Sequence, residues 1–103
     1  MAEIAKFKDL VTGEQPVLVD FFATWCGPCK ALAPILQDVA KSLDGRVRVV
    51  KIDVDRNPSI SQAYQVQGVP TLALFKDGKI LWRQSGVLPA SAIIAEVQNH
   101  FPG

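Results

Sequence analysis

The sequence contains only two cysteines, Cys26 and Cys29, in the segment Cys-Gly-Pro-Cys. They follow a largely apolar run, Val17–Phe22, at the point where a buried strand would lead into a helix. The free N–H groups of a helix N-terminus stabilise a thiolate and lower the pKa of its thiol toward neutral pH, where attack on a disulfide is fastest. We therefore expect a dithiol that is reversibly oxidised. Cys26 would be the ionised, reachable nucleophile, and Cys29 the shielded resolving thiol.

Two other roles for the cysteines are weaker. A tetrahedral zinc site needs four ligands, and apart from the two cysteines the sequence has a single histidine, His100. A purely structural disulfide that closes four residues would contribute only about 2 kcal/mol by the chain-entropy relation. We therefore expect no metal and a pair that works by redox chemistry.

Asp20 interrupts the apolar run six positions before Cys26. A carboxyl group inside a buried strand is costly, and burial raises its pKa. A raised pKa would suit Asp20 to pass a proton to or from Cys29. The alternative is a carboxylate paired with Lys51 or another cation, and both roles can hold together.

Pro70 comes just before another apolar segment, in Gln67-Gly68-Val69-Pro70-Thr71. A cis bond before Pro70 would form a special turn and leave the backbone groups of Val69 free to pair with an extended peptide. A trans proline that merely begins the strand is the alternative. The spacing of the residues leaves both open.

Apolar periodicity and turn residues predict eight elements. They are a helix over about Ile4–Val11, a strand Val17–Phe22, a helix Cys26–Leu43, a strand Arg46–Asp53, a helix Asn57–Tyr64, strands Thr71–Lys76 and Lys79–Gln84 around an Asp77-Gly78 turn, and a helix Ala90–Phe101. This order is typical of an α/β fold with a mixed sheet covered by helices on both faces. The cysteines would lie at the carboxyl edge of the sheet, where such folds place their chemistry.

Composition narrows the functional class. The chain has 103 residues, 49% hydrophobic and 20% charged, with a net charge of +1, which fits one soluble globular domain over residues 1–103. The mixed charges give no nucleic-acid groove, and no apolar run approaches the roughly 20 residues that span a bilayer. The N-terminus shows no signal-peptide pattern. We expect a mature chain in a reducing compartment, the cytoplasm or an organellar stroma.

The segment from Val19 to Lys30 closely resembles the active-site segment of the thioredoxin family, and Val69-Pro70-Thr71 recurs at that family's spacing. The resemblance covers nearly the whole chain. It implies a thioredoxin-like fold with a central mixed sheet of four strands, or five, flanked by about four helices. It also implies a monomeric oxidoreductase that reduces protein disulfides through a mixed disulfide and is recharged by a thioredoxin reductase. The redox-active Cys26–Cys29 disulfide would take the place of a cofactor.

The resemblance further implies roles for individual residues. Pro70 would follow a cis bond and pack beside the cysteines. An apolar docking surface for substrates would comprise Trp25, Gly27, Pro28, Val69, Pro70, Gly86 and Val87. Family members with His in place of Pro28 tend to be oxidants or isomerases, so Pro28 points to reduction.

The chain departs from the family at two places. Thioredoxins usually begin with an extra strand, for which only residues 1–4 are available here, so we expect four strands with Arg46–Asp53 at a sheet edge. Phe22 stands where many relatives carry Trp. Two rival functions also remain open at this point: a scaffold subunit that uses only the docking surface, and a domain that oxidises or isomerises disulfides.

Overall fold

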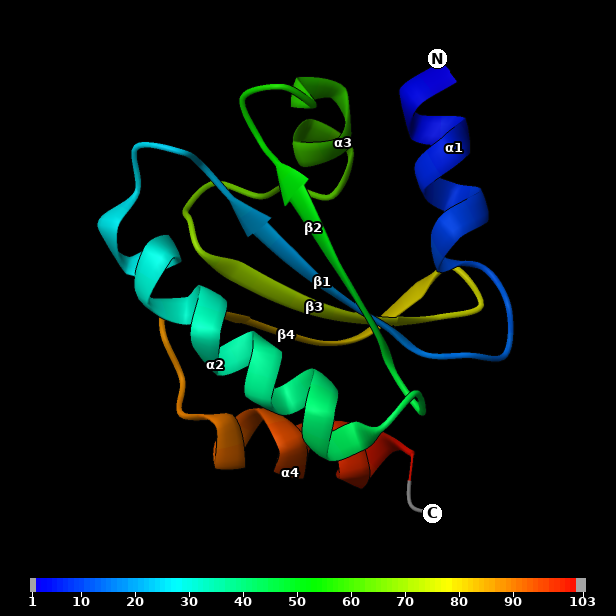
Figure 1. Cartoon of the computed structure of the whole chain (residues 1–103). Coiled ribbons are helices and arrows are strands. Elements are labelled where there is room, and N and C mark those ends of the chain that lie inside the picture. The colour runs from blue at the N-terminus through cyan, green and yellow to red at the C-terminus, as the bar shows by residue number, and fades with distance from the viewer. Residues whose placement is uncertain (1, 102–103) are drawn as a thin grey trace.

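The computed structural model describes residues 2–101, which form a sheet between two pairs of helices (Figure 1). The elements are α1 (Ala2–Val11), β1 (Val17–Phe22), α2 (Gly27–Leu43), β2 (Arg48–Asp53), α3 (Pro58–Ala63), β3 (Thr71–Lys76), β4 (Lys79–Ser85) and α4 (Ala90–His100). The strand order is β2-β1-β3-β4. The predicted α/β class, with a four-stranded mixed sheet and four helices, is confirmed.

Strand β1 lies inside the sheet because almost its entire sequence is apolar. It pairs in parallel with β2 and antiparallel with β3, which in turn pairs antiparallel with β4. Its first five residues are buried, so it receives packing on both faces. This burial fixes the position of the chain end that leads into the cysteines.

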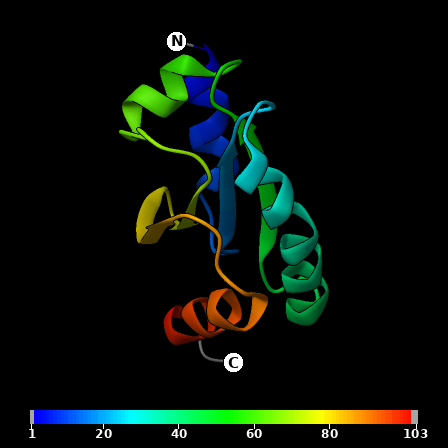
Figure 2. The same cartoon turned by 90° about the vertical axis from the view of Figure 1, so that its left-hand side faces the viewer.

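The two faces of the sheet carry separate hydrophobic cores. Helices α2 and α4 cover one face and pack around Leu18 and Leu72, while α1 and α3 cover the other and pack around Phe21 and Phe75. Figure 2 shows the sheet nearly edge-on, with α2 and α4 on the side away from α1 and α3. Alternate residues of β1 therefore point into different cores, as expected from the two-residue period of a strand.

The boundary of β2 corrects one prediction. Helix α2 ends at Asp44, which has a left-handed backbone with φ of +43°, and Gly45 follows with φ of +79°. The backbone N–H of Arg46 then donates to the carbonyl of Leu43. Because residues 44–47 complete this turn, the strand begins at Arg48 and not at Arg46. The strands Val17–Phe22 and Thr71–Lys76 have their predicted bounds, and the ends of the other elements differ from the predictions by at most two residues, as helix and strand ends commonly do.

Two further predictions about the sheet are confirmed. Asp77 and Gly78 both have positive φ, +52° and +78°, as the tight turn between β3 and β4 requires. Strand β2 lies at an edge of the sheet, because residues 2–4 belong to α1 and no strand within residues 2–101 pairs with its outer side. Met1 lies outside the described residues. Arg48 is exposed on this edge, where charge discourages pairing with another chain.

The fold brings the carboxyl end of β1, the start of α2 and the loop before β3 to one end of the sheet (Figure 1). Among residues 2–101, no helix combines the length and the apolar character needed to cross a membrane.

Candidate functional site

Cys26 occupies the N-cap position of α2. Its backbone is extended, with φ of −90° and ψ of 112°, and its N–H donates to the carbonyl of Ala23 at 3.2 Å. Pro28 stands in the first turn of the helix, where its missing N–H costs no helical hydrogen bond. This cap brings Cys29 back over Cys26, and the two form a disulfide. The pairing predicted from their spacing is therefore the pairing the structure contains.

The helix N-terminus acts directly on the sulfur of Cys26. The backbone N–H of Cys29 donates to Cys26 Sγ at 3.2 Å, and a donor aimed at this atom favours its thiolate form. The sequence predicted a reachable Cys26 and a shielded Cys29. In the disulfide form both residues are 4% exposed, so their exposure does not distinguish them. The two sulfurs differ in the hydrogen bond that Cys26 Sγ accepts from the N–H of Cys29.

The loop before β3 lies against the same sulfur. The Val69–Pro70 bond is cis, as the resemblance implied, and the Val69 carbonyl oxygen lies 3.7 Å from Cys26 Sγ. In the disulfide this sulfur carries no proton, so the approach is a contact. In the reduced protein a Cys26 thiol can donate a hydrogen bond to this oxygen.

The residues of the expected docking surface do not share one environment. Trp25 is 70% exposed, and its indole N–H donates to Asp55 Oδ2 at 2.8 Å. Gly27, Pro28, Gly86 and Val87 are also exposed. Pro70 itself is buried and Val69 is half-buried. Pro70 therefore shapes the surface from below instead of forming part of it.

Asp20 is completely buried on β1, and neither carboxyl oxygen has a hydrogen-bond partner among the described residues. Burial raises the pKa of this carboxyl from its usual 3.8 to about 6, and the charge of Lys51 opposes that rise. Lys51 is the register partner of Asp20 on β2. The predicted burial and the predicted influence of Lys51 on Asp20 both agree with this arrangement.

Lys51 is close to Asp20 without forming a direct ion pair with it in the described part of the chain. Its ammonium group lies over the ring of Phe22, 4.7 Å from the centroid. Lys51 and Cys29 both line a cavity of about 430 Å³, together with Phe22. Asp20 is not among the residues that line this cavity, so the cavity links Cys29 to Lys51 and not directly to Asp20.

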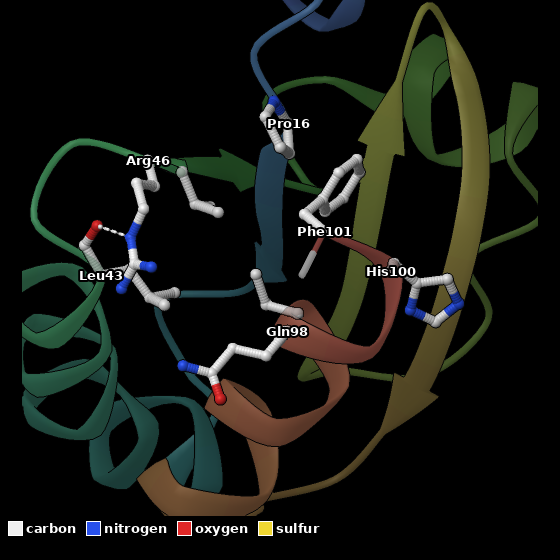
Figure 3. A pocket seen from close by; sticks show the side chains of 8 residues that line it. Pro16, Leu43, Arg46, Gln98, His100 and Phe101 are labelled. Atoms are coloured by element: carbon white, nitrogen blue, oxygen red, sulfur yellow. Dashed lines mark hydrogen bonds between the residues drawn. The ribbon is translucent and has the colours of Figure 1, made fainter. Parts of the chain in front are cut away.

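A second hollow, of about 410 Å³, lies at the other end of α2, between Leu43, Arg46 and the last turn of α4 (Figure 3). Arg46 donates from Nε to the carbonyl of Leu43 there. Leu43 lies fourteen positions after Cys29 in the helix, roughly 20 Å away at the helical rise. This hollow is therefore separate from the disulfide. No group of three or more metal-ligating side chains is assembled among the described residues.

The thioredoxin family model matches residues 2–99. The chain belongs to the thioredoxin family. It is 47% identical over 97 residues to the thioredoxin-like protein slr0233 of Synechocystis, covering 93% of this chain and 92% of that one. It is 47% identical over 94 residues to thioredoxin Y2, chloroplastic, of Arabidopsis thaliana, covering 90% of this chain. It spans only about half, 56%, of that chloroplastic relative.

The comparison of structures agrees. The oxidised mitochondrial thioredoxin 3 of Saccharomyces cerevisiae superposes with a TM-score of 0.83 at 33% identity, covering 93% of this chain and 89% of that one. The Cys26–Cys29 pair of this thioredoxin is thus a redox-active disulfide of the family type, and the protein is a thiol–disulfide oxidoreductase.

Three contacts of this thioredoxin site were not predicted. They are the bond from Trp25 to Asp55, the stacking of Lys51 on Phe22, and the hydrogen bonds of two β4 side chains to Gln65 and Thr71, on either side of the loop before β3. Each joins residues at least 14 positions apart. A local sequence signal cannot identify such pairs, because only the packing of the elements brings them together.

Proposed function

We propose that this thioredoxin reduces protein disulfides, with Cys26 as the attacking nucleophile and Cys29 as the resolving thiol. The observation that carries the assignment is the hydrogen bond from the Cys29 N–H to Cys26 Sγ. It favours charge on Cys26, and the thiolate is the form that attacks a disulfide. The first turn of α2 holds Cys29 within bonding distance of Cys26 for the second step.

The reaction balances as two exchanges. The Cys26 thiolate attacks one sulfur of the substrate disulfide and forms a mixed disulfide, and the other substrate sulfur leaves as a thiolate that takes up a proton. The Cys29 thiol then loses its proton and attacks Cys26 Sγ, which releases the second substrate sulfur. The substrate gains two electrons and two protons, and the protein returns to the Cys26–Cys29 disulfide seen here.

Asp20 is the base proposed to take the proton from Cys29, with Lys51 as its partner. Its pKa of about 6 leaves it largely ionised at neutral pH yet able to accept a proton, which is the condition for general base catalysis. The proposed route runs past Lys51, which is the register partner of Asp20 and lines one cavity with Cys29. The charge of Lys51 keeps the pKa of Asp20 from rising further.

Substrates are proposed to dock on a surface made by Trp25, Gly27, Pro28, Val69, Gly86 and Val87, supported by Pro70. Exposed apolar side chains such as Trp25 and Val87, 70% and 42% exposed, favour contact with an unfolded or extended partner segment. The Val69 N–H has no partner among residues 2–101, so it is available to a substrate backbone.

The electron donor is proposed to be a thioredoxin reductase, and the location the cytoplasm or an organellar stroma. A dithiol that works as a reductant requires a reducing compartment. One relative is named as chloroplastic, which supports the stromal alternative. We infer a monomer, with Pro28 between the cysteines favouring reduction over oxidation.

Reduction of insulin by the chain tests the proposal. Cys26→Ser should abolish the activity, and Cys29→Ser should accumulate a mixed disulfide with the substrate. Unchanged insulin reduction by Cys26→Ser would eliminate the dithiol mechanism. A reduction potential as oxidising as about −180 mV, typical of a disulfide isomerase, would favour the oxidising or isomerising role instead.

A further inference from the structure

The loop over residues 66–70, called here the docking loop, is fastened to β4 at both ends. It joins α3 to β3 and carries Val69, whose carbonyl oxygen lies 3.7 Å from Cys26 Sγ. Within the loop, the Val66 N–H donates to the carbonyl of Ser61 at 2.8 Å, and further hydrogen bonds flank the loop. Two side chains of β4, Arg83 and Ser85, supply the side-chain part of these bonds.

Arg83 holds the start of the loop. Its guanidinium group donates from Nη1 to the carbonyl of Tyr64 and from Nη2 to the carbonyl of Gln65, the second at 2.6 Å. The chain reverses direction here, and Gln65 has a left-handed backbone with φ of +55°. Neither carbonyl accepts a backbone N–H from the described residues. The planar fork of an arginine suits two such acceptors at once, and a lysine does not.

Ser85 holds the end of the loop through Thr71. The buried Thr71 hydroxyl donates to the carbonyl of Gly68 at 2.7 Å. Its single proton is thereby used, so in the 2.9 Å bond between Thr71 Oγ1 and Ser85 Oγ the serine is the donor. The neighbouring Gly86 N–H donates to the carbonyl of Pro70 at 2.9 Å. These bonds tie residues 68–70 to the end of β4.

Arg83 and Ser85 act from one side of the sheet. They lie two positions apart on β4 and so point to the same face of the sheet. Their register partners on β3 are Ala73 for Arg83 and Thr71 for Ser85. Ala73 points into the core beneath α1 and α3. The two side chains therefore bind the residues on either side of the docking loop from the α3 face, while Cys26 lies against Val69 within the loop.

We propose that Arg83 and Ser85 are positioning residues that hold the docking loop beside Cys26, so that a protein disulfide meets Val69 already in place. This inference rests on the proposed function of Val69 in docking. A loop fixed before binding spares the complex the cost of ordering it. A small disulfide reaches Cys26 without touching the loop, so its rate of reaction does not depend on whether the loop is ordered beforehand.

The experiment measures second-order rate constants of the reduced protein with two substrates. Insulin represents a protein disulfide, and 5,5′-dithiobis(2-nitrobenzoic acid) represents a small disulfide. Arg83→Met keeps the length of the side chain and removes its donors, and Ser85→Ala removes the hydroxyl. Each should slow the reaction with insulin about threefold or more, as expected for the loss of hydrogen bonds that order the site. The small disulfide should react at the wild-type rate.

Three further variants and one further measurement separate positioning from general stability. Arg83→Lys should resemble Arg83→Met, and Ser85→Thr should restore the wild-type rate with insulin. Arg48→Met removes an exposed arginine at the opposite edge of the sheet and should change neither rate. Hydrogen exchange at the amides of Val66 and Gly86, which donate to the carbonyls of Ser61 and Pro70, should be faster in Arg83→Met and Ser85→Ala and unchanged in Arg48→Met.

Equal slowing with both substrates, or wild-type rates with insulin in Arg83→Met and Ser85→Ala, would overturn the inference. If the wild-type protein reduced neither substrate, the proposed function would fail. The exchange data would still decide the positioning role in that case. Faster exchange at Val66 and Gly86 in the variants would support it, and unchanged exchange would refute it.

Discussion

The buried carboxyl of Asp20 makes the stability of this protein depend on pH. Its pKa rises from 3.8 to about 6 because burial removes it from water, against the opposing charge of Lys51. A carboxyl whose pKa is higher in the folded state binds its proton more tightly there. The folded state therefore loses stability as the pH rises from about 4 to about 6, and the loss persists at higher pH.

The structure gives the size of the effect. A rise of about two pKa units, at about 1.4 kcal/mol each, corresponds to roughly 3 kcal/mol of lost stability at pH 7.5 and less than about 1 kcal/mol at pH 4. Asp20→Asn replaces the carboxyl by a neutral group of similar shape. Relative to the wild type, the variant should therefore gain roughly 2 kcal/mol in free energy of unfolding between pH 4 and pH 7.5.

Urea unfolding of the oxidised proteins at the two pH values measures this gain. Asp38→Asn is the matched control, because Asp38 is exposed on α2 and its replacement should alter stability little at either pH. A stability difference between Asp20→Asn and wild type that stays constant from pH 4 to pH 7.5 would refute the reasoning. The same variant should also slow the step in which Cys29 resolves the mixed disulfide.

Three other predictions concern the same site. Lys51→Met should raise the pKa of Asp20 above about 6, because the Lys51 ammonium group lowers this pKa in the wild type. Carbon NMR titration of the Asp20 carboxyl measures the pKa, and an unchanged or lower value would contradict the prediction. Gly86→Ala should lower the free energy of unfolding by more than about 1 kcal/mol, because the φ of Gly86 is +97°. Gly27→Ala is the control and should not lower it, because Gly27 has an ordinary φ and an added Cβ would meet nothing within 4 Å. Urea unfolding compares the two variants, and equal effects would count against backbone strain at Gly86. In the reduced protein, iodoacetamide at neutral pH should modify Cys26 before Cys29, because the N–H of Cys29 stabilises the Cys26 thiolate. Peptide mass spectrometry follows the modification of each cysteine. Equal rates at the two cysteines would contradict the roles of Cys26 as nucleophile and Cys29 as resolving thiol.

Several features could be predicted from the sequence because their signals are local. The apolar run of β1, the Asp77-Gly78 turn and the periodicity of α2 each lie within one short segment, and all three form as expected. The Cys-Gly-Pro-Cys segment likewise predicted a disulfide at the start of a helix. Asp20 was identified because a carboxyl group is out of place in a strand that is otherwise apolar.

The tertiary structure decided what each of these residues meets. Whether Pro70 forms the surface or supports it from below depends on the elements packed over it, and it is buried. Lys51 stacks on Phe22 without forming an ion pair with Asp20 within the described chain. Arg83 and Ser85 reach Gln65 and Thr71, the residues on either side of the docking loop, only because β4 pairs with β3. Local sequence determines the helices, the strands and the spacing of the two cysteines. Contacts between distant segments arise only when the chain is packed, and so does the desolvation that these contacts cause.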